Sequence, residues 1–166
     1  MRIALSLCFF LAACTRIGSE YSDESRIAAS EYAVGVALKA EAMSQTCMSL
    51  LPPGVGDNKE AYAKWVAQNR GYATSAGLWR ERLYAHIAQT EGAEAAARLK
   101  RKFEEASTQL LQREIRSLLK GNAVDIERCN SFASFLRTDA SNLSAHPEFG
   151  PYMAGFVSAF PAVRKQ

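Results

Sequence analysis

The sequence contains none of the short motifs that identify a common catalytic or metal-binding site. It has no Cys-x-x-Cys-His, His-Glu-x-x-His or Gly-x-Ser-x-Gly segment, and no phosphate-binding glycine loop. Only 2 histidines are present, and the carboxylates are scattered over surface-like positions and helix ends. Because no nucleophile and base, or paired acid and base, can be assembled from these residues, the sequence predicts a protein that is not an enzyme.

Strong net charge and long hydrophobic runs are also absent. The 20 Lys and Arg residues oppose 17 Asp and Glu residues, and this formal net charge of +3 gives no reason to expect nucleic acid as a partner. After the first 13 residues, no apolar run reaches the ~20 residues that a transmembrane helix requires. No segment alternates apolar and polar residues over a useful length, so no strands are predicted.

The N-terminal segment of the chain has the features of an export signal. Arg2 precedes an apolar stretch over residues 3–13, which has the size of a signal-peptide core and is too short to cross a bilayer. The stretch ends in Leu11-Ala12-Ala13-Cys14, which resembles the lipobox of bacterial lipoproteins. The resemblance implies cleavage before Cys14 and a diacylglycerol on its sulfur. Secretion with cleavage near Ala13 and no lipid is the alternative.

The resemblance divides the chain into a signal peptide (residues 1–13), a tether (14–21) and a helical domain (22–166). In Gram-negative bacteria, Thr15 after the cysteine implies sorting to the outer membrane, on its periplasmic face, so the membrane would be one partner. Cys8 would leave with the signal, and Cys14 would carry lipid. Cys47 and Cys129 would then remain as an even pair in an oxidising compartment.

Helical periodicity covers the rest of the chain. Apolar residues recur three and four positions apart over residues 23–50, 57–89, 93–120, 122–143 and 151–160. Ser22 and Asn122 are predicted to cap the first and fourth helices, and Asp57 with Glu60 forms a capping box for the second. Since long amphipathic helices with short connections pack as antiparallel neighbours, the predicted fold is all-α: an up-down four-helix bundle with a short extra C-terminal helix.

That topology predicts a structural disulfide between Cys47 and Cys129. Cys47 would lie ~5 Å below the top of the first helix and Cys129 ~10 Å below the top of the fourth, at 1.5 Å per residue. Both cysteines lie on the apolar stripes of helices that are neighbours in the bundle. Two separate buried thiols are one alternative. A redox pair is another, but it lacks a short Cys-x-x-Cys loop.

A second pairing follows from the turn near residues 91–92. Asn69 and Glu114 are each about 22 positions from that turn, so in an antiparallel helix pair they would lie at one level. A buried carboxylate needs a donor, and an Asn amide can supply one. The sequence therefore predicts that these two side chains face each other, unless both lie in water on the rim.

The most unusual pattern is an aromatic ladder, in which four residues recur every seven positions: Trp65, Tyr72, Trp79 and His86. On an α-helix they drift only ~20° per step, so they line one edge of the apolar stripe. They can belong to the core, or they can line a groove for a peptide, glycan or apolar ligand, with Arg80 and Arg82 as nearby donors.

These features predict a non-enzymatic, membrane-tethered periplasmic lipoprotein that binds an envelope protein or peptide. The type of partner, whether for inhibition, immunity, adaptor function or envelope assembly, stays open, because the comparison with such bundles is one of fold alone. The alternative is a carrier of a small ligand or cofactor in the bundle core. A haem held by one Met and one His, from Met43 or Met48 and His86 or His146, is a weaker form of that alternative, and no cofactor is expected.

Overall fold

The computed structural model describes residues 23–52, 58–120, 123–161 and 163. Its elements in chain order are α2 (Glu24–Leu50), α3 (Asn58–Thr90), α4 (Ala93–Ser117), β1 (Leu119–Lys120), β2 (Ala123–Val124), α5 (Ile126–Leu136), the 3₁₀ turns η1 (Asp139–Ser141) and η2 (Leu143–Ala145), and α6 (Gly150–Ala159). The all-α prediction is confirmed. The lipobox and the predicted capping residues Ser22, Asp57 and Asn122 lie outside the described residues.

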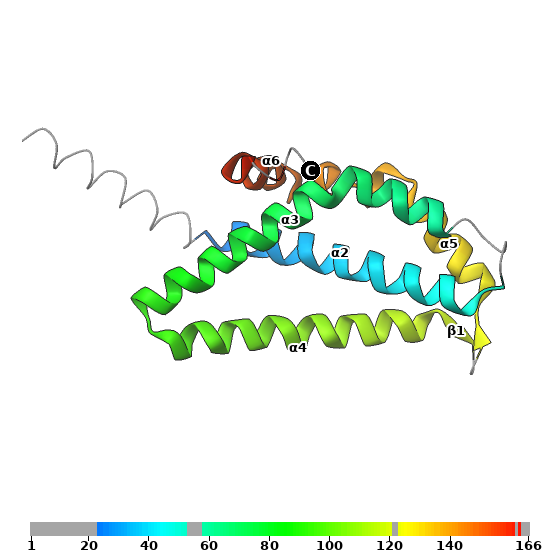
Figure 1. Cartoon of the computed structure of the whole chain (residues 1–166), viewed down its shortest axis with the longest axis horizontal. Coiled ribbons are helices and arrows are strands. Elements are labelled where there is room, and N and C mark those ends of the chain that lie inside the picture. The colour runs from blue at the N-terminus through cyan, green and yellow to red at the C-terminus, as the bar shows by residue number, and fades with distance from the viewer. Residues whose placement is uncertain (1–22, 53–57, 121–122, 162, 164–166) are drawn as a thin grey trace, which may run out of the picture.

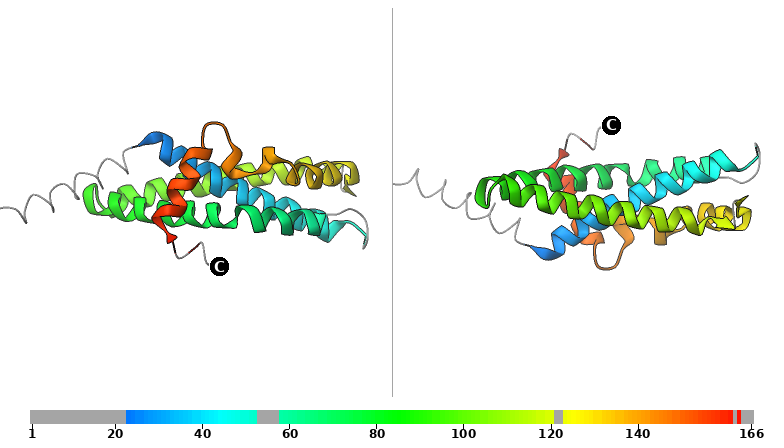
Figure 2. Two further views of the ribbon diagram at one scale, coloured as in Figure 1. Left: turned by 90° about the horizontal axis from the view of Figure 1, so that it is seen from above. Right: turned by 90° about the horizontal axis from the view of Figure 1, so that it is seen from below.

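The three long helices α2, α3 and α4 lie beside one another, and each runs in the opposite direction to the one before it (Figure 1). The chain then returns along the bundle through α5 and the two 3₁₀ turns to α6. Figure 2 shows that α6 crosses the long helices at a steep angle instead of running along them. Among the described helices, none is both long and apolar enough to span a bilayer.

Small residues allow α2 and α3 to approach closely. The buried side of α2 carries Ala29, Ala33 and Ala40, each no more than 2% exposed. On α3, a Cβ atom added at Gly77 would lie 4.0 Å from a Val34 methyl group, which is ordinary van der Waals contact. The larger core side chains of α3, among them Trp65, Trp79 and Leu83, belong to the same apolar cluster as these alanines.

Local chemistry sets the start of α2 and the turn between α3 and α4. The Asp23 carboxylate accepts hydrogen bonds from the backbone N–H groups of Ser25 (3.0 Å) and Arg26 (3.3 Å), so the capping residue of α2 is Asp23, one position after the predicted cap. Gly92 has a φ angle of +99°, which an L side chain rarely adopts, and it reverses the chain between α3 and α4.

The prediction that the chain has no strands was wrong. Helix α4 ends at Ser117 instead of residue 120, and β1 and β2 form a short antiparallel ladder that pairs Leu119 with Val124. The Asp125 carboxylate then caps α5 through the Arg128 N–H. Two residues per strand are too few to produce an alternating sequence pattern, which explains why periodicity did not reveal them.

The fourth predicted helix is also shorter than expected. Helix α5 ends at Leu136 instead of residue 143, and the chain continues as η1 and η2. The predicted disulfide is confirmed: Cys47 on α2 and Cys129 on α5 are bonded, with their Cα atoms 5.7 Å apart. It fastens the first long helix to the returning segment.

Candidate functional site

Two members of the aromatic ladder belong to the core. Trp65 and Trp79 are 2% and 1% exposed. The Trp65 indole N–H donates to the Ser141 carbonyl oxygen at 3.0 Å, which satisfies the polar atom of the buried ring. The Trp79 ring packs against Phe156 of α6, with ring centroids 5.5 Å apart. For these two residues, the core interpretation holds.

Tyr72, the ladder residue between them, lines an open groove. This α3–α6 groove has a volume of about 670 Å³, and small residues form much of its lining: Ala63, Ala67, Gly71, Thr74 and Ala154. Gln68 and Arg70 also line the groove and are exposed. Tyr72 is half-buried, so part of its ring is accessible from the groove. The combination of an apolar lining with a few polar groups suits an apolar peptide segment better than a charged substrate.

The other predicted members of this surface lie elsewhere. Arg80 places its guanidinium 5.5 Å from the ring centre of Phe103 on α4. Arg82 stacks 4.1 Å above the ring centre of Phe160. Neither arginine, nor the half-buried His86, is among the residues that line the α3–α6 groove. The residues of the aromatic ladder thus do not form one binding surface, because α6 and the 3₁₀ turns cover part of the apolar stripe of α3.

The predicted pairing of Asn69 with Glu114 was wrong, and each side chain has a different partner. Asn69 is fully buried, its Oδ1 accepts the Leu143 N–H at 2.8 Å, and its Nδ2 donates to the Trp65 carbonyl at 3.0 Å. Glu114 instead forms an ion pair with Lys39 of α2, with 2.8 Å between nitrogen and oxygen. The 3₁₀ turn η2 passes over α3 at Asn69, where the Leu143 N–H binds the amide oxygen. The amide N–H group that was predicted to donate to Glu114 donates to the Trp65 carbonyl instead.

His146, one of the candidate haem ligands, fixes a loop. Its Nδ1 atom accepts the backbone N–H groups of Glu148 (3.3 Å) and Phe149 (3.1 Å). Its ring stacks on Phe149 and lies 4.4 Å, centre to centre, from Tyr32. Within the part of the chain that the structure describes, no group of three or more His, Cys, Asp or Glu side chains could hold a metal ion.

Comparison with protein-family models, curated proteins and solved structures finds no match to this chain.

Proposed function

We propose that this protein is a non-enzymatic lipoprotein, tethered to a bacterial membrane on its periplasmic side, which binds an envelope protein or peptide. The observation that carries the proposal is the disulfide between Cys47 and Cys129, taken together with the lipobox-like end of the apolar leader. Structural disulfides form and persist in oxidising compartments, and the bacterial periplasm is one of them. The two features are independent, since one is a local motif and the other needs residues 82 positions apart.

The binding role is supported by the α3–α6 groove. A protein or peptide partner would place apolar side chains against its alanine and glycine wall, with the Tyr72 ring as a rigid contact. Arg70 and Gln68 would provide donors for a peptide backbone or a carboxylate.

The membrane address is tested by mass spectrometry of protein extracted from membranes of the native host. We expect a chain that starts at Cys14 and carries acyl mass. Cys14→Ser should leave unprocessed precursor, whereas Cys8→Ser, the matched control within the same leader, should be processed normally. A soluble wild-type product without acyl mass would refute the proposed lipid anchor.

The groove is tested by photo-crosslinking in cells. A photoreactive residue at Ala67, which is exposed in the groove, should give a discrete cross-linked product. The same residue at Ala97, which is exposed on α4 and does not line the groove, is the control. Equal products from both positions, or no product from Ala67, would contradict a partner in the groove. Thermal unfolding of both variants verifies that the substitutions leave the fold intact.

A further inference from the structure

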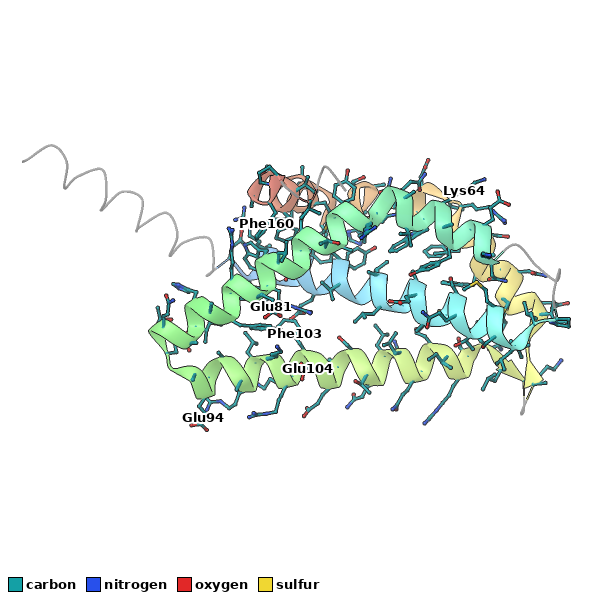
Figure 3. All side chains as sticks on the ribbon, in the orientation of Figure 1. Lys64, Glu81, Glu94, Phe103, Glu104 and Phe160 are labelled. Carbon is teal, nitrogen blue, oxygen red and sulfur yellow. A yellow bond between two sulfur atoms is a disulfide. The ribbon has the colours of Figure 1, made fainter. Side chains whose placement is uncertain are left out.

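A second cavity lies farther along α3, towards the α3–α4 turn. It has a volume of about 220 Å³ and is lined by residues of α2, α3 and α4. The rings of Tyr84 and Phe103 line it in a T-shaped arrangement, with centroids 6.2 Å apart, and both residues are buried. Leu38 and Leu111 extend this apolar surface. Figure 3 shows Phe103 between α3 and α4, with Glu81 on the α3 side and Glu104 on the α4 side.

Arg80, which also lines this cavity, has unused hydrogen-bonding capacity. Its Nε atom is buried, yet no acceptor contacts it within the described parts of the chain. The guanidinium lies against the Phe103 ring and interacts electrostatically with the Glu31 carboxylate. A guanidinium offers five N–H donors in a planar fork that matches a carboxylate. An arginine held against a ring beside an open cavity, with a buried donor unsatisfied, is suited to a ligand that brings an acceptor.

The cavity also carries negative charge. Glu81 and Glu104 line it together with Lys100. Burial raises the pKa of the Tyr84 hydroxyl. The positive charge of Arg80 lowers this pKa, and the negative charges of Glu81, Glu104 and Glu31 raise it further. Two cations, Arg80 and Lys100, and three carboxylates thus lie around the Tyr84 ring. A simple anion would be repelled by the carboxylates and a simple cation by Arg80 and Lys100, so a ligand with both charges fits best.

The volume limits the size of such a ligand. A space of 220 Å³ equals that of about seven liquid water molecules at ~30 Å³ each. It is smaller than the ~300–1,000 Å³ of sites for drug-sized molecules. An α-amino acid with an aliphatic side chain has the required size, the two opposite charges and an apolar part for the ring surface.

We propose that this cavity binds the zwitterion of a small apolar α-amino acid. The carboxylate bonds to the Arg80 guanidinium, the ammonium group faces Glu81 and Glu104, and the side chain packs on Phe103 and Leu38. This site lies outside the α3–α6 groove and does not depend on the lipid anchor, so it stands or falls separately from the proposed function.

Calorimetric titration of the full mature protein, with its disulfide intact, tests the proposal. L-leucine is the probe, and N-acetyl-L-leucine and L-leucinamide each lack one of its charges. We expect leucine to bind saturably. Both analogues should bind at least about tenfold more weakly than leucine, because each loses a charge-assisted contact. Equal affinity for leucine and N-acetyl-leucine would show a carboxylate site only and would overturn the zwitterion. No saturation by leucine up to about 10 mM would overturn the site itself.

Substitutions identify which residues hold the ligand. Arg80→Met should weaken leucine binding about tenfold or more. Arg82→Met is the matched control, because Arg82 also lies over an aromatic ring but outside the cavity, and leucine should bind it as it binds wild type. Glu104→Gln, at an exposed residue, should weaken the binding of leucine but not of N-acetyl-leucine, which has no ammonium group and is repelled by the Glu104 carboxylate. This variant tests the ammonium contact if Arg80→Met does not fold. Unchanged leucine affinity in Arg80→Met, or in Glu104→Gln, would refute the proposal.

Discussion

Replacing Asn69 by leucine removes the oxygen that accepts the buried Leu143 N–H. The bond is 2.8 Å long and joins α3 to η2, 74 positions away in the sequence. Both residues are fully buried, so water cannot replace the lost acceptor without opening the structure. The variant therefore tests how the segment after α5 is held on α3.

The size of the effect follows from the hydrogen bonds that Asn69 makes. A buried donor left without an acceptor costs about 1–3 kcal/mol. The second bond, from Nδ2 to the Trp65 carbonyl, contributes less, because a carbonyl within a helix already accepts from the backbone. The leucine side chain adds apolar burial that offsets part of the loss. We expect a net destabilisation of about 2 kcal/mol, which corresponds to a Tm lower by about 4–8 °C for a domain of this size.

Urea unfolding of the oxidised protein measures this loss, and hydrogen exchange locates it. The Leu143 amide should be well protected in the wild type and should exchange much faster in Asn69→Leu. Gln68→Leu, at the adjacent exposed position, is the control and should change the free energy of unfolding by less than about 0.5 kcal/mol. If Asn69→Leu is as stable as this control, or if Leu143 stays equally protected, the reasoning is refuted.

Three further predictions concern stability. Replacing both cysteines of the Cys47–Cys129 disulfide by alanine should remove up to about 4.5 kcal/mol, as the 82-residue separation implies, and a urea midpoint close to that of wild type would contradict a structural role. Gly150→Ala should destabilise by about 1–3 kcal/mol because a Cβ would overlap the Ser144 carbonyl oxygen. Gly155→Ala has room within α6 and should not destabilise, because alanine favours a helix over glycine by up to about 1 kcal/mol. Glu31→Gln should slightly stabilise the protein at neutral pH: burial raises the Glu31 pKa more than Arg80 lowers it, so the folded state binds the proton more tightly and ionised Glu31 opposes folding. This gain should disappear as the pH falls through the carboxyl pKa, and a gain that persists in acid would disprove the assignment.

The sequence predicted the parts of the fold that repeat or that follow from helix geometry. Long amphipathic stretches revealed α2, α3 and α4, with ends within three residues of those observed. Antiparallel helices also fix which residues share a level, and that is why Cys47 and Cys129 could be paired from counting alone. The helices follow from the local spacing of apolar residues, and the cysteine pairing follows from that spacing together with an up-down topology.

The rest depends on contacts that local spacing does not contain. Helix α5 stops at Leu136, and the following turns are held by two hydrogen bonds: the Trp65 indole donates to Ser141, and the Leu143 N–H donates to Asn69. Those partners lie 76 and 74 positions away. The position of Asn69 within an apolar stripe indicated that its side chain needs a hydrogen-bond partner, but it did not identify that partner.

The two cavities escaped prediction for the same reason. The α3–α6 groove exists because α6 crosses α3 beside Tyr72, and the second cavity needs side chains from three helices. The sequence identified Tyr72 and Arg80 as residues of interest. It gave no sign that Phe103 of α4 would support the Arg80 guanidinium.

The disulfide also determines what proteolysis can do to this molecule. The exposed turn at Gly92 lies between Cys47 and Cys129 in the chain, and a protease would find it there. A single cut at that turn would divide the backbone, yet the two fragments would stay covalently joined and would migrate as one species on a non-reducing gel. Release of the C-terminal fragment would require either reduction or a second cut outside the loop, so a nicked molecule would remain in place wherever its N-terminal segment is held.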